Sequence, residues 1–419
     1  MAFSSNAVST DRLTNRAAGS SSGPGEPGIA STGTLRTRGA FTERIRRETR
    51  IFQSPITRYG AILLVALAIV LPLSTADSFL LSLGITVGFF SIAAIGLNVV
   101  NGYAGQIMMG QPFFLAIGAF TAVGFGSDLN LPLPVWILAV VVVGAIAGLL
   151  VAPLALRLKG VYQIVLSLGL IFIGHYIFVN WTSLTGGVSG RRAPLNLSVG
   201  PIDFGALSFG GMTYSYQQGL FMLVWVFVAL CMFLVHLLMK SPGGRSVVAL
   251  RDSELAARVV GINPARSMFG VFAISSAMGA LGGAFYVAQL RFVSPEQFNL
   301  AMGLTFIIIV TVGGLSTPWG PVVGSLVICS VPVLASRYAD FIPFLRPSAS
   351  VPDGTWGIPV GQFPVVIYGV LLVLILMFEP RGLTHMIKVF ALWVSRPLRR
   401  VSPAKAARER EQVDAEWTP

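Results

Sequence analysis

The polar side chains that could do chemistry inside the apolar blocks of this chain are mostly amides. Four of them, Asn98, Asn101, Gln106 and Gln111, stand in the stretch 96–111 (GLNVVNGYAGQIMMGQ). Its glycines interrupt a helix, and interrupted helices expose backbone groups that can hold polar solutes. The amides therefore either line a path for a polar solute or bond neighbouring helices together, and the sequence leaves both interpretations open.

Ionisable side chains are scarce in the same blocks. No Asp, Glu, Lys or Arg stands near the middle of an apolar block, and His175 is the mid-block candidate for lining a path or for a hydrogen-bonded packing role. Ion-driven pumps and carriers commonly bury carboxylates or histidines as proton relays. Proton-coupled chemistry is therefore disfavoured, whereas Na⁺ held by backbone carbonyls is not excluded.

Enzyme motifs are missing as well. The sequence has no G-x-x-x-x-G-K-[ST], no G-x-S-x-G and no H-E-x-x-H. Cys231 and Cys329 stand in apolar blocks with no second ligand at a useful spacing, which indicates packing residues. We expect no catalytic residue, no metal site and no cofactor in this chain. If ATP drives its function, a separate subunit must bind the nucleotide.

Composition indicates what positions these residues. Hydrophobic residues make up 54% of the 419 and charged residues only 11%, against about 25% in soluble domains. Runs such as 61–73 and 135–151 approach the roughly 20 apolar residues that cross a hydrocarbon core. A soluble helix would interrupt such runs with a polar face. The chain is therefore predicted to be a polytopic membrane protein.

The predicted fold class is all-α, with about ten transmembrane helices. The candidate spans are 59–76, 79–100, 107–126, 134–154, 162–180, 219–239, 268–290, 302–315, 319–336 and 363–379. Gly279, Gly282 and Gly283 in the seventh span predict a close approach between helices.

The net charge of +12 raises the question of nucleic acid as a partner. Its distribution indicates a membrane instead, because 24 of the 29 Lys and Arg residues fall on one side when the N-terminus is placed inside. This asymmetry predicts a multi-pass protein of the bacterial inner membrane with both termini cytoplasmic, and no nucleic acid partner.

Three regions follow along the chain. Residues 1–58 are rich in Ser, Thr, Gly, Pro and Arg and predict a disordered basic cytoplasmic tail, in which 38–58 is either a surface helix or solvated chain. Residues 59–382 form the predicted transmembrane domain, and 383–419 a second basic tail. The segments 181–218 and 337–362 are turn-rich and external, either capping a pore or merely connecting spans.

The loop 240–267 is the most specific feature (KSPGGRSVVALRDSELAARVVGINPARS). Residues 245–260 are good helix formers, and Gly261 with Asn263-Pro264 supplies a stop. Arg251, Glu254 and Arg258 stand at i, i+3 and i+7, which predicts a charged stripe on a single helix. A membrane subunit that receives motion from an ATPase needs such an element.

Several motifs together carry a family resemblance. Glu254-Leu255-Ala256-Ala257 followed by Gly261 resembles the E-A-A…G coupling loop of ATP-binding-cassette importer permeases. The whole of 241–266 is similar to that loop in the branched-chain amino acid permeases. The likeness continues in the following segments: 96–120, 157–169, 271–286, 293–296, 312–324 and 378–383.

The resemblance implies a permease subunit that translocates leucine, isoleucine and valine by alternating access. Its implied partners are ATPase subunits, a second homologous permease, an external solute-binding protein and the lipid bilayer. It implies coupling roles for the loop residues Arg251, Glu254, Ala256, Ala257 and Gly261. A urea or short-amide permease is the alternative within the family, and an ion-coupled carrier or a membrane scaffold the alternatives outside it.

Three departures from the family pattern bear on these expectations. The 58-residue tail has no counterpart, the segment 337–362 is unusually long, and Met108-Met109-Gly110-Gln111 replaces a more polar sequence. The last of these lies close to the expected path and therefore bears on which solute the chain carries.

Overall fold

A computed structural model gives the architecture of the chain. The structure describes residues 77–158, 160–200, 202–205, 208–209, 212–213, 215–337, 345–346, 358–359, 367–370, 373, 377 and 382–384. Every described residue belongs to one compact unit, Ser54–Pro419. The predicted N-terminal tail, the predicted C-terminal tail apart from Leu383 and Thr384, and the first predicted span, 59–76, lie outside the described residues, as does most of the tenth.

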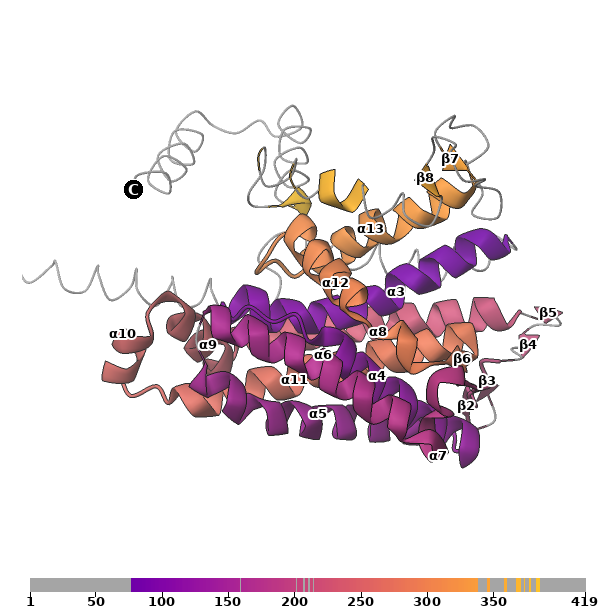
Figure 1. The fold of residues 1–419 in the computed structure, drawn as a ribbon, viewed down its shortest axis with the longest axis horizontal. Helices are drawn as coiled ribbons and strands as arrows, with labels where there is room; N and C mark the ends of the chain where they lie inside the picture. The colour runs from indigo at the N-terminus through magenta and orange to yellow at the C-terminus, as the bar shows by residue number, and fades with distance from the viewer. Residues whose placement is uncertain are drawn as a thin grey trace, which may run out of the picture. The chain divides into compact units, whose positions relative to one another are not determined.

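Helices make up most of the described chain (Figure 1). The longer ones are α3 (Ser78–Asn98), α4 (Gln111–Ala122), α5 (Leu133–Arg157), α6 (Val161–Asn180), α8 (Tyr216–Lys240), α9 (Pro242–Asp252), α11 (Pro264–Leu290), α12 (Leu300–Gly313) and α13 (Gly320–Arg337). The short ones are the π-helices η1 (Val99–Tyr103) and η2 (Val123–Asp128), α7 (Thr182–Thr185), α10 (Glu254–Val259) and the 3₁₀ turns η3 (Gly187–Ser189) and η4 (Pro295–Gln297).

Within the part of the chain that the structure describes, strands are limited to two-residue pieces. They are β1 (Arg191–Arg192), β2 (Ser198–Val199), β3 (Ile202–Asp203), β4 (Ser208–Phe209), β5 (Met212–Thr213), β6 (Phe292–Val293), β7 (Leu345–Arg346) and β8 (Ile358–Pro359). They pair antiparallel as β1 with β6, β2 with β3 and β4 with β5, and parallel as β7 with β8. The segment 181–218, for which two interpretations were open, thus carries short helices and hairpins.

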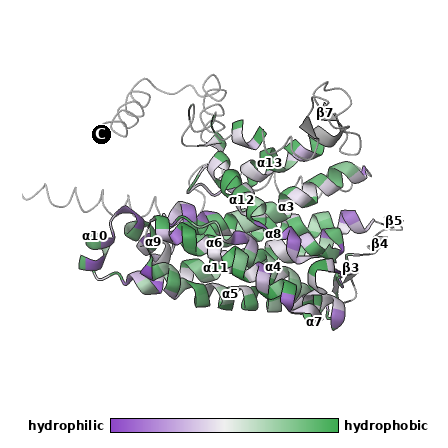
Figure 2. Ribbon diagram, viewed as in Figure 1, coloured by the Kyte–Doolittle hydropathy of each residue, from purple (hydrophilic) through white to green (hydrophobic). Residues whose placement is uncertain are grey.

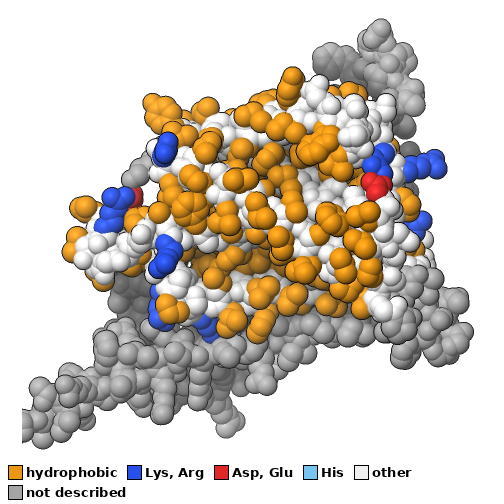
Figure 3. All heavy atoms as spheres, turned by 90° about the horizontal axis from the view of Figure 1, so that it is seen from below, with side chains coloured by type: hydrophobic (Ala, Val, Ile, Leu, Met, Phe, Trp, Pro, Cys, Tyr) orange, Lys and Arg blue, Asp and Glu red, His pale blue; other side chains and the backbone are white. Residues whose placement is uncertain are grey.

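Among the described residues, six helices are long and apolar enough to cross a membrane. They are Ser78–Tyr103, Leu133–Arg157, Val161–Asn180, Tyr216–Lys240, Pro264–Leu290 and Pro295–Gly313, and Gly320–Leu334 is a shorter apolar helix. Apolar residues extend along the helices while polar residues collect toward their ends (Figure 2). On the face seen in Figure 3, hydrophobic side chains cover the middle and Lys and Arg gather at two ends. The predicted all-α membrane-spanning fold class is confirmed.

The third predicted span differs in its start. The prediction began at 107, whereas α4 begins at Gln111, because residues 104–110 are not helical and Gly105 has a φ of +67°. This positive φ is a backbone conformation that favours glycine. The interruption expected from the glycines of 96–111 is therefore present, and η1 and α4 flank it.

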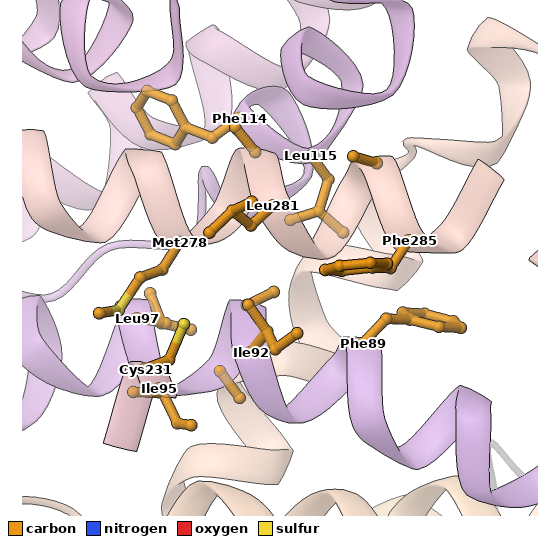
Figure 4. Packing of buried hydrophobic residues seen from close by; sticks show 14 of the residues in the cluster. Phe89, Ile92, Ile95, Leu97, Phe114, Leu115, Cys231, Met278, Leu281 and Phe285 are labelled. Carbon is orange, nitrogen blue, oxygen red and sulfur yellow. The ribbon is translucent and has the colours of Figure 1, made fainter. Parts of the chain in front are cut away.

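Helix α11 is the centre of the described bundle. In its most apolar stretch of 18 residues 83% are buried, whereas in the corresponding stretch of α6 only 28% are buried. Asn263 caps its start by accepting hydrogen bonds from the amides of Ala265 and Arg266, with Pro264 at the first helical position. Figure 4 shows Met278 and Leu281 of α11 lying between side chains of α4 and α3.

Glycines set the distance between α11 and its neighbours. A Cβ on Gly283 would lie 1.9 Å from the carbonyl oxygen of Leu115 in α4. On the facing helix, a Cβ on Gly118 would lie 1.9 Å from the carbonyl oxygen of Ala280. Each helix thus presents a glycine to the backbone of the other, as small residues allow in membranes. The close approach predicted from the α11 glycines is confirmed.

This contact predicts a sharp difference between two glycines of the same helix. Gly283→Ala should destabilise the chain by about 1–3 kcal/mol, since the new methyl group meets backbone that cannot move aside. Gly270→Ala, where a Cβ meets nothing within 4 Å, should be neutral or stabilising by up to about 1 kcal/mol through helix propensity. Thermal unfolding in detergent measures both variants, and equal melting temperatures would contradict the packing.

Candidate functional site

The loop between α8 and α11 contains two helices rather than one. The sequence predicted a single helix over 245–260, and that prediction is wrong at Ser253, where φ is −158° and ψ is 108°. Ser253 caps α10 by accepting a hydrogen bond from the amide of Ala256 (3.3 Å). Serine competes with helix continuation by bonding to nearby backbone groups, so it favours a helix start over a helix interior.

The predicted charged stripe is correspondingly divided. Glu254 and Arg258 form an ion pair across one turn of α10 at 2.6 Å. Arg251, on α9, turns instead to the bundle: its Nη1 donates to the carbonyl oxygen of Gly102 (2.9 Å) and to Oγ of Ser316 (2.6 Å). The break at Ser253 separates Arg251 from the stripe, so the prediction of one stripe is wrong.

The site that receives Arg251 joins two distant segments. Asn98 accepts a hydrogen bond from the amide of Ser316 (3.0 Å) and donates to the carbonyl oxygen of Thr317 (2.9 Å). The hydroxyl of Ser316 donates to the carbonyl oxygen of Gly102 (2.8 Å). One hydrogen-bond network, which we call the Arg251 network, therefore connects α9, η1 and the turn between α12 and α13. Its members are Asn98, Gly102, Arg251, Ser316 and Thr317.

Helix α10 ends as the sequence predicted. Gly261 has a φ of +88° and donates to the carbonyl oxygen of Arg258 (3.0 Å), while Ile262 donates to that of Ala257 (3.0 Å). These two bonds form a Schellman motif, which requires the left-handed conformation that glycine adopts easily. A Cβ on Gly261 would meet nothing within 4 Å, so the turn has open space around it.

The surface of α10 is unusually apolar for a short helix between charged residues. Leu255, Val259 and Val260 are 78%, 83% and 81% exposed. Ala256 is also exposed, whereas Ala257 is buried against the rest of the chain. α10 lies at one end of the bundle beside α9, and we call this the α9–α10 end (Figure 1). Exposed apolar groups of this kind mark interaction surfaces.

The amides of 96–111 mostly bond to backbone. Asn101 donates to the carbonyl oxygen of Met108 (3.2 Å) and accepts from its amide (3.1 Å), which holds the non-helical segment 104–110. Gln111 is fully buried and donates to the carbonyl oxygen of Ala93 (2.9 Å), while its Oε1 has no hydrogen-bond partner. Of the two open interpretations, this geometry matches the helix-bonding one for Asn98, Asn101 and Gln111.

Gln106 and His175 lie apart from this cluster. Gln106 is half-buried and lines a small cavity of ≈ 50 Å³ together with Glu254 and Met268, at the α9–α10 end. His175 lies 3.9 Å from the Glu296 carboxylate, which precedes α12. The structure thus joins Asn98 to Arg251 and leaves His175 at another place on the bundle.

Sequence reasoning missed Gly102, Ser316 and Thr317 as functional neighbours of Arg251. Arg251 and Gly102 are 149 positions apart, and no local pattern connects them. The available signal was the turn Leu315-Ser316-Thr317-Pro318, whose residues favour hydrogen bonding to nearby backbone over helix.

The family model described as "Branched-chain amino acid transport system / permease component" matches residues 79–377. The chain is 28% identical over 318 residues to the high-affinity branched-chain amino acid transport system permease protein LivM of Salmonella typhimurium, covering 71% of this chain and 68% of that protein. LivM of Escherichia coli K12 is 27% identical over 310 residues, with the same coverage.

A second group of relatives is named for a different solute. The autoinducer 2 import system permease protein LsrC of Escherichia coli O9:H4 is 28% identical over 263 residues, covering 61% of this chain and 71% of that protein. No solved structure matches the chain.

The Arg251 network predicts that loss of the guanidinium changes local backbone dynamics. Arg251→Gln should speed hydrogen–deuterium exchange in 102–106 and 314–319, because both segments lose the guanidinium that joins them. The matched control is Arg245→Gln, since Arg245 is an exposed arginine on the same helix. Faster exchange in both variants, or in neither, would contradict the role of Arg251 in holding these segments.

Proposed function

This chain belongs to the family of permease components of branched-chain amino acid transport systems, and we propose that it is a transmembrane subunit of an ATP-driven importer of leucine, isoleucine and valine. The family model covers 79–377, so within the described residues it takes in all six helices that are long enough to span a membrane, apart from Ser78 at the start of the first. In this proposal separate ATPase subunits bind and hydrolyse ATP, a second homologous permease completes the path, and an external binding protein delivers the solute.

The observation that carries the proposal is the exposed apolar surface of α10. Leu255, Val259 and Val260 lie outside the spanning helices, so the bilayer core does not cover them, and the rest of the described chain does not bury them. A groove on a partner subunit is the occupant that removes them from water. About 25 cal/mol is gained per Å² of apolar surface buried, which favours such docking.

The Arg251 network would pass motion of a docked ATPase subunit on to the spanning helices. When an ATPase subunit displaces α10 and α9, Arg251 pulls on Gly102 at the end of η1 and on Ser316 between α12 and α13. Two spanning segments then move with the loop. Glu254 and Gly261 support the surface, one by pairing with Arg258 and the other by ending α10 in a tight turn. Alternating access follows from this tilt of the spans.

The charge distribution supports placing the α9–α10 end in the cytoplasm of a bacterium. Among the described residues, the Lys and Arg at this end are Arg157, Lys240, Arg245, Arg251, Arg258 and Arg266. At the opposite end, which we call the β1–β6 end after that strand pair, stand Arg191, Arg192 and Arg291. An excess of Lys and Arg marks cytoplasmic loops. Both termini are then cytoplasmic, and the chain resides in the inner membrane.

The solute preference rests on the character of the spans. An aliphatic amino acid is a zwitterion with an apolar side chain, so a path of neutral dipoles and aliphatic walls lets it bind and leave, whereas a fixed charge would hold one end too tightly. Within the six described spans, Asp, Glu, Lys and Arg stand only at or near the ends. The relatives named for branched-chain amino acids also cover more of this chain than the relative named for autoinducer 2.

Uptake in a strain that lacks this subunit tests the proposal. The unaltered chain should restore uptake of leucine, isoleucine and valine, and a Leu255→Ser, Val259→Ser double variant should reach the membrane but restore less than about a tenth of that uptake. Leu138→Ser, an exposed apolar position within α5, serves as a control outside the loop. Restored uptake of urea or autoinducer 2 without leucine would contradict the substrate, and full uptake by the double variant would contradict the docking.

A further inference from the structure

A cleft opens at the β1–β6 end of the bundle, away from α9 and α10. It has a volume of ≈ 510 Å³ and lies between the first turns of α3 and α8 and the last turn of α11. Its walls include Ser78, Ser82, Tyr216, Leu220, Gln289 and Arg291. The beginnings of α3 and α8 lie at the same end of the bundle as β4 and β5 (Figure 1).

Arg291 is held rigidly at the edge of this cleft. It ends α11 in the left-handed conformation, with a φ of +53°, which is uncommon for a residue other than glycine. Its amide donates to the carbonyl oxygen of Val287 (2.7 Å), and its own carbonyl oxygen accepts from the amide of Ala193 (2.9 Å). These two bonds fix the backbone from which the guanidinium extends.

The guanidinium is positioned by an aromatic ring. Its central carbon lies 3.7 Å from the centre of the Tyr216 ring, and the Tyr216 hydroxyl donates to the carbonyl oxygen of Ala288 (2.7 Å). Stacking uses the face of the guanidinium and leaves the N–H groups at its edge free to bind in the plane. A guanidinium fixed in this way can donate two parallel hydrogen bonds to a carboxylate.

Three other arginines of the described chain use their N–H groups to bind protein atoms. Arg191 pairs with Asp128, Arg258 pairs with Glu254, and Arg251 bonds to Gly102 and Ser316. For the Arg291 side chain the described residues supply the Tyr216 ring but no hydrogen bond or ion pair. None of the described residues that line the cleft is acidic. The cleft therefore favours an anion.

The remaining walls suit an aliphatic group. Ile85, Leu220 and Leu290 line the cleft beside the polar residues. Gln289 donates to Ser82 and Thr86 of α3, which fixes the wall between α3 and α11. A cation on a stacked ring, next to hydroxyls and three aliphatic side chains, matches a molecule with a carboxylate at one end and a short branched chain at the other.

We propose that this cleft binds the carboxylate of an aliphatic amino acid through Arg291 before the solute enters the bundle. The proposal rests on the function proposed above and assigns it a receiving site at the β1–β6 end. Arg291 stands at the end of a span, so a carboxylate bound there is released into a path whose middle carries no fixed charge.

Chemical protection tests the site without requiring transport. The full chain in phosphatidylcholine nanodiscs is treated with phenylglyoxal, and modification of Arg291 is followed by mass spectrometry. L-Leucine should slow modification of Arg291 several-fold and leave Arg192, an exposed arginine at the same end, unchanged. Leucinamide, which lacks the carboxylate, should protect neither residue.

Three outcomes of this experiment would overturn the proposal. The first is an unchanged rate at Arg291 in the presence of leucine, and the second is equal protection by leucinamide. The third is protection by phosphatidylglycerol in the nanodisc that leucine cannot alter, because it would assign the cleft to a lipid headgroup.

Uptake kinetics connect the site to transport. Arg291→Gln should raise the KM for leucine about tenfold, since hydrogen bonds to a charged group are lost. Arg291→Lys should raise it nearly as much, because lysine keeps the charge but not the stacked fork. Arg192→Gln should leave KM unchanged, and an unchanged KM in both Arg291 variants would contradict the site. If the unaltered chain carries no leucine, the proposed function fails, while the protection experiment still judges the cleft.

Discussion

Close packing of α11 against its neighbours is the constraint on which the rest of the described structure depends. Gly283 and Gly118 bring the backbones of α11 and α4 together, and a single methyl group at either position would collide with a carbonyl oxygen. Lipid tails are as apolar as leucine side chains, so burial of apolar surface alone does not hold helices together in a membrane. Shape does, and it makes α11 a rigid axis.

That axis connects the two regions to which roles are proposed. α11 begins directly after α10, at Pro264, and its last residue, Leu290, precedes Arg291 at the β1–β6 end. At 1.5 Å per residue its 27 residues extend about 40 Å, which is enough to cross a bilayer. A displacement of the loop at one end therefore reaches the cleft at the other through a helix packed on several sides.

Polar groups inside the bundle serve this rigidity. Non-helical backbone at membrane depth is tolerated only where other groups satisfy it. Asn101 satisfies Met108 in the segment 104–110, and Asn98 with Arg251 satisfies the turn at Ser316. Asn98 and Asn101, two of the four amides that the sequence offered as path-lining groups, thus bond the two interruptions of the bundle to their surroundings.

Much of the fold was predictable because its causes are local. Apolar runs predicted the spanning helices, and Gly261 with Asn263-Pro264 predicted the end of α10 and the start of α11. The break at Ser253 was missed because helix propensity over 245–260 favours continuation, and one capping hydrogen bond overrides it. The partners of Arg251 could not be predicted, since they depend on how segments far apart in sequence pack together.

The central claim is that Arg251 transmits motion of the loop to the spans, and the number of ATP molecules hydrolysed per leucine imported tests it most directly. The measurement uses the complete importer in proteoliposomes, with Arg251→Gln compared with the unaltered chain and with Arg245→Gln. The account predicts that Arg251→Gln keeps hydrolysing ATP while importing several-fold less leucine per ATP, and that Arg245→Gln is unchanged. An unchanged ratio and rate in Arg251→Gln would contradict it.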